Sequence, residues 1–203
     1  MDEVTDAQLK QFRARLAAFV EFNEAEWIVM TQYISVKQLK KKAHFVEPGE
    51  VCKYLGFVAT GSVRYFHIID GKDITNYFSF ENDFVSSYKS FLTGETCISY
   101  IEALEPSTIL VVSKKNWEEM LNNPMLAYKI ERLGRLIAEY YLICYEDRLT
   151  GFITQTPEER YLQLLENGKD IIRRMPQHYI ANFLGITPVS LSRMRKRIMV
   201  NSR

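Results

Sequence analysis

The stretch Tyr179–Arg197 constrains the fold more than any other part of the chain. Ala181 is small enough to lie where two helices approach closely, and Gly185 can adopt the positive φ of a sharp turn between helices. Thr187 can cap a second helix with its side-chain oxygen, and Pro188 suits the first helical position, where no N–H is needed. This order of residues predicts two helices around a tight turn, the pattern of a DNA-binding helix-turn-helix.

The two faces of the second predicted helix carry different side chains. Leu184, Leu191 and Met194 are spaced to close a small core between the helices. The residues that we expect at DNA are Thr187, Ser190, Arg193, Arg195, Lys196 and Arg197. The first three are expected near the groove and the last three at the phosphate backbone. A plain helical hairpin with a solvated basic face can show the same spacing, so the charge distribution must decide between the two.

Positive charge is concentrated in the same part of the chain. From Lys169 to Arg203 there are eight Lys or Arg residues and one acid, Asp170, which gives this segment a charge of +7. Because the whole chain carries +1, residues 1–168 carry −6. A basic module joined to an acidic body is the distribution expected of a protein that binds phosphates with one end, and it favours DNA binding over a plain hairpin.

Length and composition exclude several classes. The chain has 203 residues, enough for one large or two small domains, and 47% of them are hydrophobic, so a substantial core can form. It has no apolar run of about eighteen residues, and its start, Met1–Asp6, is acidic rather than basic. Neither a membrane span nor a secretory signal is predicted. We therefore expect a cytoplasmic protein that does not bind membranes.

The cysteines, histidines and other residues able to act in catalysis or bind metals do not form a known catalytic or metal-binding pattern. The three cysteines and three histidines are scattered, and no Cys-x-x-Cys occurs. There is also no Gly-x-Ser-x-Gly, no glycine-rich phosphate loop and no His–Glu metal spacing. We predict no catalytic residues, no metal site and no cofactor, and we rank an enzyme last among the function classes.

Residues 1–123 are predicted to form a helical start followed by an antiparallel β-structure. Residues 5–43 show helical spacing, with a second helix from about Glu24 to Tyr33 capped by Asn23. The predicted strands are 45–46, 55–59, 62–69, 75–80, 98–104 and 108–112. Asp70-Gly71 between two of them is a strong signal for a two-residue hairpin turn. Short strands at this spacing predict a sandwich or β-roll, whose interior can hold a ligand or be filled by side chains.

A long helix is predicted from about Met125 to Arg148. Apolar residues recur along it at spacings of 4, 3, 4, 3 and 4, at Leu126, Ile130, Leu133, Ile137, Tyr140 and Cys144. A heptad spacing of this kind favours a dimer seam over an internal core stripe, although Leu136, Tyr141 and Leu142 lie off the seam and can pack on the roll. Two helix-turn-helix units in one dimer can read two half-sites one DNA turn apart.

The remaining boundaries complete an α+β organisation. Thr150–Gln155 is predicted to be a short hinge, and Thr156-Pro-Glu-Glu159 a capping box that begins a helix to about Glu166. We predict three parts: N-terminal helices and a β-roll over residues 1–123, a dimerisation helix with its hinge over 124–150, and an all-α helix-turn-helix domain over 151–203.

This order of parts resembles the Crp/Fnr family of bacterial transcription regulators. The resemblance rests on Phe45-Val-Glu-Pro-Gly-Glu50, Thr60-Gly-Ser-Val-Arg64 and the Gly71-Lys-Asp73 turn, followed by the long helix and the helix-turn-helix. It covers almost the whole chain. It implies an antiparallel β-roll (double-stranded β-helix or jelly roll) that acts as a sensor, and a homodimer that binds promoter DNA and regulates transcription. RNA polymerase is a further candidate partner that this role implies.

The chain departs from the family pattern at the expected ligand site of the roll and at the expected DNA-reading helix. Where the family's cyclic-nucleotide binders have Gly-Glu for the ribose and Arg-Ser or Arg-Thr for the phosphate, this chain has Ser86-Ser87 and Cys97-Ile98. Neither replacement offers the bidentate donors of an arginine, so we predict weak or absent binding of cyclic AMP. The candidate ligand-pocket residues are Ser86, Ser87, Tyr88, Lys89 and Cys97. In the reading helix, Pro188 and Val189 stand where family members commonly have arginine and glutamate.

The leading hypothesis is therefore a homodimeric, sequence-specific DNA-binding transcription regulator of Crp/Fnr type with an unidentified effector. The alternative is a small-ligand sensor that signals to a protein partner, with the terminal helices as its docking module. The two differ in whether the basic segment is required for specific binding to DNA.

Overall fold

The computed structural model describes residues 4–201, so Arg203 of the basic segment lies outside the described residues. The chain divides into two compact units. The first contains the residues up to Tyr65 together with Ser79–Tyr141, and the second contains Phe66–Phe78 and the residues from Leu142 onward. Each unit is described by itself below.

The first unit begins with two capped helices, α1 (Asp6–Ala17) and α2 (Glu24–Thr31). The predicted cap of α2 is confirmed, because the Asn23 side chain accepts from the Glu26 N–H and Glu26 accepts from the Asn23 N–H. The prediction of helix through residue 43 is wrong. Residues Ser35–Leu39 form strand β1, which pairs antiparallel with β8 (Ser107–Ser113). Register with a neighbouring strand overrides the local helical spacing there.

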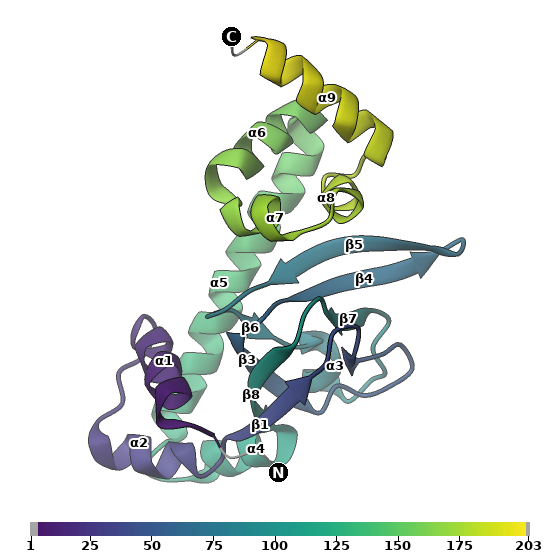
Figure 1. Ribbon diagram of the computed structural model, residues 1–203. Helices are drawn as coiled ribbons and strands as arrows, with labels where there is room; N and C mark the ends of the chain where they lie inside the picture. The colour runs from purple at the N-terminus through teal and green to yellow at the C-terminus, as the bar shows by residue number, and fades with distance from the viewer. Residues whose placement is uncertain (1–3, 202–203) are drawn as a thin grey trace. The chain divides into compact units, whose positions relative to one another are not determined.

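The predicted α+β fold with an antiparallel β-roll is confirmed. The strands not yet named are β2 (His44–Val46), β3 (Tyr54–Thr60), β4 (Val63–Ile69), β5 (Lys72–Ser79), β6 (Phe84–Val85) and β7 (Tyr100–Ala103). They form two four-stranded sheets, ordered β1-β8-β3-β6 and β2-β7-β4-β5 (Figure 1). Strand β6 and the short helix α3 (Tyr88–Thr93) were not predicted. The Asp70-Gly71 turn is confirmed, with φ of 51° and 72°, the double positive φ of a tight hairpin.

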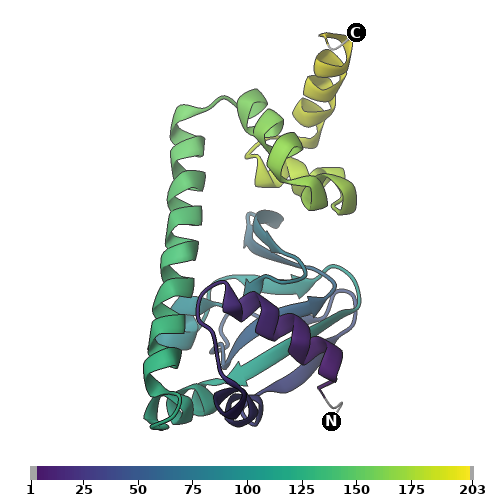
Figure 2. The same cartoon turned by 90° about the vertical axis from the view of Figure 1, so that its left-hand side faces the viewer.

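The core of this unit consists of two clusters, because side chains along each strand point alternately to the two faces of the sheet. Val58, Ile109 and Val111 point into a cluster between the two sheets, together with Val63 and Ile101 of the second sheet. The residues between them point the other way, onto helices. This second cluster contains Phe57 and Leu110 with residues from α1, α2, α4 (Lys114–Asn122) and the long helix. Figure 2 shows α1, in purple, lying across the sheet. Because successive strand residues face opposite sides, one set of strands serves both cores.

The long helix α5 runs from Ala127 to Thr154, and four shorter helices follow it. These are α6 (Pro157–Asn167), α7 (Lys169–Arg174), α8 (Gln177–Phe183) and α9 (Pro188–Asn201). The capping box at Thr156–Glu159 is confirmed. The hinge predicted at Thr150–Gln155 is wrong over most of its length, because α5 continues to Thr154. Gly151 has the lowest helix propensity of these residues, yet the hydrogen bond from Gln155 N to Gly151 O keeps the helical pattern to its end.

Within residues 4–201, none of the helices is both long enough and apolar enough to cross a membrane.

Candidate nucleic-acid interface

The turn between α8 and α9 has the geometry that its sequence predicts. Gly185 has a φ of 72°, and its N–H donates to the carbonyl of Asn182 at 2.9 Å. The next N–H, of Ile186, donates to the carbonyl of Ala181 at 2.9 Å. Together these two bonds form a Schellman motif, which ends a helix abruptly and satisfies two of its last carbonyls. The turn is therefore fixed by its own hydrogen bonds.

Helix α9 begins with the predicted cap. Thr187 Oγ1 accepts from the Ser190 N–H at 3.1 Å, and the two hydroxyl oxygens of these residues lie 2.9 Å apart. The predicted small core is also present, because Leu184, Leu191 and Met194 are buried. Thr187 and Ser190 bond one another at the start of α9, so the polar side chains nearest that end of the helix already have a structural role.

The predicted DNA-contacting cations lie on α9 but differ in their surroundings. Arg193 and Lys196 are exposed, and in the described part of the chain they form neither a hydrogen bond nor an ion pair. Arg195 is half-buried, and Arg197 is paired with Glu158 of α6. A phosphate would have to compete with that carboxylate for Arg197. Arg193 and Lys196 are thus the two cations most available to an incoming anion.

Two arginines that the sequence analysis missed hold the end of α8. Arg148 of α5 donates from Nη2 to the carbonyl of Phe183 at 2.9 Å, and Arg160 of α6 donates from Nη2 to the carbonyl of Leu184 at 2.9 Å. These are the last carbonyls before Gly185, where a helix end carries partial negative charge. Both side chains also face aromatic rings, with the Arg148 guanidinium carbon 3.8 Å from the Phe183 ring centre. They fasten the helix-turn-helix to α5 and α6.

Phe152 of α5 connects this arginine pair to the turn itself. Its ring centre is 4.9 Å from the Arg148 guanidinium carbon and 4.6 Å from that of Arg160. A Cβ added to Gly185 would lie 2.9 Å from the Phe152 ring. The glycine is therefore required twice, for its positive φ and for the close approach of this ring. No sequence motif indicated the cluster, because Arg148, Phe152 and Arg160 come from two helices, α5 and α6, and meet at the end of a third, α8.

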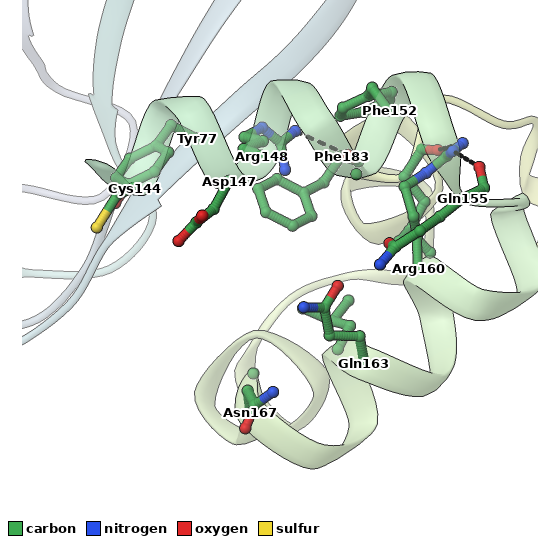
Figure 3. A pocket seen from close by; sticks show the side chains of 14 residues that line it. Tyr77, Cys144, Asp147, Arg148, Phe152, Gln155, Arg160, Gln163, Asn167 and Phe183 are labelled. Carbon is green, nitrogen blue, oxygen red and sulfur yellow. Dashed lines mark hydrogen bonds between the residues drawn. The ribbon is translucent and has the colours of Figure 1, made fainter. Parts of the chain in front are cut away.

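A cavity of about 300 Å³ lies beside the arginine pair, within the second unit. Figure 3 shows that it is bordered by side chains of α5 and α6 and by Phe183 of α8. Burial, opposed by the neighbouring tyrosines Tyr77 and Tyr145, lowers the pKa of the Arg148 guanidinium to about 10. Two buried atoms at this cavity, Gln155 Oε1 and Arg160 Nε, have no hydrogen-bond partner among the described residues.

The predicted ligand-pocket residues of the roll do not form a charged site. Cys97 is buried in the core between the sheets, and its thiol donates to the carbonyl of Glu47 at 2.7 Å. Burial raises the pKa of this thiol, so it stays protonated at neutral pH. Ser86 donates to the carbonyl of Tyr54 at 3.0 Å, and the exposed Lys89 pairs with Glu95 at 2.9 Å.

The other two residues of that predicted site lie at the start of α3. Ser87 is the residue before the helix but makes no side-chain cap, and Tyr88 is 43% exposed. Partial burial raises the pKa of the Tyr88 hydroxyl. In the described part of the chain, no group of three or more His, Cys, Asp or Glu residues is placed to hold a metal ion.

The predicted dimer seam requires a correction. Leu126, Ile130 and Leu133 are buried in their own chain's core against α1, α2 and α4, so they are not available to a second copy. Ile137 is partly buried in the same cluster, Tyr140 packs on Phe19 with ring centres 5.9 Å apart, and Cys144 borders the cavity of the second unit. The first half of the face with heptad spacing therefore points inward, whereas Tyr140 in its second half is 42% exposed. Leu142, Leu149 and Ile153, on another face of α5, are 66%, 62% and 75% exposed.

Comparison with known proteins agrees with this architecture. Residues 36–123 match the family model of the cyclic nucleotide-binding domain. No curated protein matches the chain by sequence. Among solved structures, FixK2 from Bradyrhizobium japonicum is 19% identical, with a TM-score of 0.64 over 83% of this chain and 86% of that one. The c-di-GMP-responsive global regulator CLP from Xanthomonas campestris is 13% identical, with a TM-score of 0.67 over 86% and 91%.

A transcriptional regulator of the Crp/Fnr family from Eubacterium rectale is similar as well. It is 18% identical, with a TM-score of 0.60 over 89% of this chain and 85% of that one. At these identities the likeness concerns the fold. The roll, the long helix and the terminal helices occur in the same order as in those regulators, and the chain, with a cyclic nucleotide-binding-like domain over residues 36–123, resembles the Crp/Fnr transcription regulators.

Proposed function

We propose that this chain is a homodimeric, sequence-specific DNA-binding regulator of transcription. The observation that carries the proposal is helix α9: a rigid turn and a cap fix its start, and Arg193 and Lys196 project from it into solvent. A helix positioned in this way can enter the major groove with its first turns. The similarity to Crp/Fnr regulators supports this role over a plain helical hairpin.

The second copy is proposed to pack on the exposed apolar strip of α5, formed by Leu142, Leu149 and Ile153. Positions seven and four residues apart lie on one face of a helix, and apolar residues exposed on one face often mark a protein–protein interface. A dimer about this helix would present two copies of α9 to a two-fold symmetric site. The predicted seam along Leu126–Cys144 is replaced by this face.

The experiment is selection of preferred sites from random duplex DNA by the purified full-length protein. We expect a two-fold symmetric site and an affinity that falls steeply with salt. Recovery of no preferred sequence would contradict the proposal and favour a protein partner. Arg193→Ala should weaken binding by about 1–3 kcal/mol, with the loss confined to one position of each half-site, if Arg193 contacts a base. Lys115→Ala, at an exposed residue of α4, is the matched control and should leave DNA binding unchanged.

The sensor is proposed not to use cyclic AMP. Cys97, which stands where the resemblance places the phosphate arginine, is buried and bonded to a backbone carbonyl. The neighbouring Ile98 is 79% exposed and offers no donor from its side chain. Calorimetry should therefore detect no binding of cyclic AMP at micromolar concentrations, and a dissociation constant in that range would overturn this part of the proposal.

A further inference from the structure

The cavity beside Arg148 and Arg160 has the composition of a ligand site rather than of a packing defect. Its volume of about 300 Å³ lies at the lower end of the range typical of small-molecule pockets, about 300–1,000 Å³. Phe152, Phe183 and Leu164 supply apolar surface to its wall. Empty cavities left by imperfect packing are lined by apolar atoms alone, whereas this one is also bordered by two arginines and three amides.

Arg148 is the cation at this cavity with the most unused hydrogen-bonding capacity. One of its amino groups, Nη2, bonds to the carbonyl of Phe183, while its other donors have no partner among residues 4–201. Arg160 has less, because both of its amino groups already bond to carbonyls, of Gln155 and Leu184, and only its buried Nε lacks a hydrogen-bond partner among the described residues. A guanidinium that is partly removed from water gains more from an anion than an exposed one does.

Three amide side chains border the same cavity, at Gln155, Gln163 and Asn167 (Figure 3). In the described part of the chain, Gln163 and Asn167 make no side-chain hydrogen bond, and Gln155 Oε1 is buried without a partner. Amides of this kind can donate to or accept from a polar group on a ligand. Asp147 also borders the cavity, but it is exposed, so water screens its charge.

We propose that this cavity binds a small organic anion with an apolar body. The anionic group lies against Arg148, the apolar body against Phe152, Phe183 and Leu164, and the amides contact any further polar group. The site belongs to the second unit, and it shares no lining residue with the candidate pocket of the roll, which consists of Ser86, Ser87, Tyr88, Lys89 and Cys97. Because Arg148 also holds the last turn of α8, occupancy alters the support of the helix-turn-helix; this last step rests on the proposed DNA-binding function.

The test is calorimetry on the full-length protein with 2-naphthoate, compared with its neutral analogue 2-naphthamide and with inorganic phosphate. We expect 2-naphthoate to bind at least about tenfold more tightly than either, since both charge and apolar body contribute. Arg148→Gln should lower its affinity about tenfold or more. Arg173→Gln removes an exposed cation of the same unit and should leave the affinity for 2-naphthoate unchanged. Equal affinity for all three compounds, or no binding at millimolar concentration, would overturn the site.

Arg148→Gln also removes a contact to α8, so a second variant separates binding from folding. Gln163→Trp adds bulk at the cavity mouth from an exposed position without side-chain hydrogen bonds, and it should abolish 2-naphthoate binding while leaving the unfolding temperature unchanged. Wild-type affinity in a folded Gln163→Trp protein would place the ligand elsewhere.

DNA affinity with and without 2-naphthoate tests the coupling, and we expect a change of at least about threefold. Binding of 2-naphthoate without such a change would overturn the coupling alone. Failure to bind DNA at all would refute the proposed function and leave the calorimetric result intact.

Discussion

The two halves of helix α5 have similar apolar content but different surroundings. In the first half, Leu126 just before the helix and Ile130 and Leu133 within it are buried by α1, α2 and α4 of the same chain. In the second half, Leu142, Leu149 and Ile153 face solvent, and another face borders the cavity beside Arg148. One helix therefore serves as a core element in one unit and as an exposed surface in the other.

This difference shows what a heptad spacing does and does not indicate. The spacing locates an apolar face on the helix, because residues three and four apart lie on one side. It does not say whether that face is covered by the same chain or by a second one. Here the first half of the face with the most regular spacing is internal, and the apolar residues of another face, Leu142, Leu149 and Ile153, are exposed.

The largest effect should come from the buried half. Ile130→Ala removes a fully buried side chain and should lower the free energy of unfolding by about 2–5 kcal/mol, through lost burial and the cavity that remains. Urea unfolding followed by circular dichroism measures the change. Glu131→Ala, at the exposed neighbour, is the control and should stay within about 0.5 kcal/mol of wild type. A small effect of Ile130→Ala would mean that this half is not covered by its own chain.

The exposed half should affect association rather than folding. Leu149→Glu places a charge in the proposed dimer strip, and we expect dimerisation to weaken by about 2 kcal/mol or more, with little change in unfolding of the monomer. Sedimentation equilibrium measures the dissociation constant. Thr150→Glu introduces the same charge one residue away, outside the strip, and should leave the dimer intact. A Leu149→Glu protein that dimerises like wild type would place the partner on another surface.

Substitution by alanine at two glycines of the second unit, Gly185 and Gly151, should change the free energy of unfolding in opposite directions. Gly185→Ala forces a Cβ into a left-handed conformation and against Phe152, and we expect a loss of about 1–2 kcal/mol. Gly151→Ala, within α5, meets only the end of a flexible glutamine side chain and should gain up to about 1 kcal/mol in helix propensity. Thermal unfolding of the two variants distinguishes them. Stabilisation by Gly185→Ala would contradict the turn geometry.

The smallest effect is expected from the ion pair between Glu26 and Lys129, which joins α2 to the buried first half of α5. Lys129 of α5 donates to Glu26 at 2.5 Å, and this bond, with the N–H of Asn23, lowers the pKa of the Glu26 carboxyl. A lowered folded-state pKa means that the stabilisation is present above the unfolded value of 4.5 and is lost as the pH falls below it.

Glu26→Gln should therefore cost about 1 kcal/mol at pH 7 and less at pH 3, measured by urea unfolding at both values. Glu24 forms an exposed ion pair with Arg13, and Glu24→Gln should have almost no effect at either pH. Equal losses for Glu26→Gln at the two pH values would show that the charge contributes nothing.

Local chemistry predicted the parts of the fold that depend on neighbours in sequence. The caps at Asn23, Thr156 and Thr187, the Asp70-Gly71 hairpin and the Gly185 turn all follow from backbone preferences of single residues. The predictions that needed distant partners were less successful. Strand β1 was missed because only pairing with β8 stabilises it. The first half of the predicted seam, Leu126 to Leu133, is covered by its own chain, because periodicity does not identify the covering surface.

The candidate nucleic-acid interface shows the same difference between features set by neighbours in sequence and features set by distant residues. The cations of α9 were predicted from charge and turn chemistry, whereas Arg148, Phe152 and Arg160 were not singled out. These three residues come from α5 and α6, and their shared role depends on the carbonyls of Phe183 and Leu184. In sequence each is an ordinary helical residue, and the only early signal was that two of them are arginines near predicted helix ends.

The hold of Arg148 and Arg160 on the last carbonyls of α8 has a practical consequence for dissecting the chain. A fragment that starts at residue 151 would retain Arg160 but lose Arg148, leaving the carbonyl of Phe183 without its donor and the Phe183 ring without its stacked guanidinium. A fragment that starts several turns earlier in α5 would keep both. The shortest piece able to present α9 in its native form should therefore include a stretch of the long helix, and its length should be chosen by this contact rather than by where the helix ends.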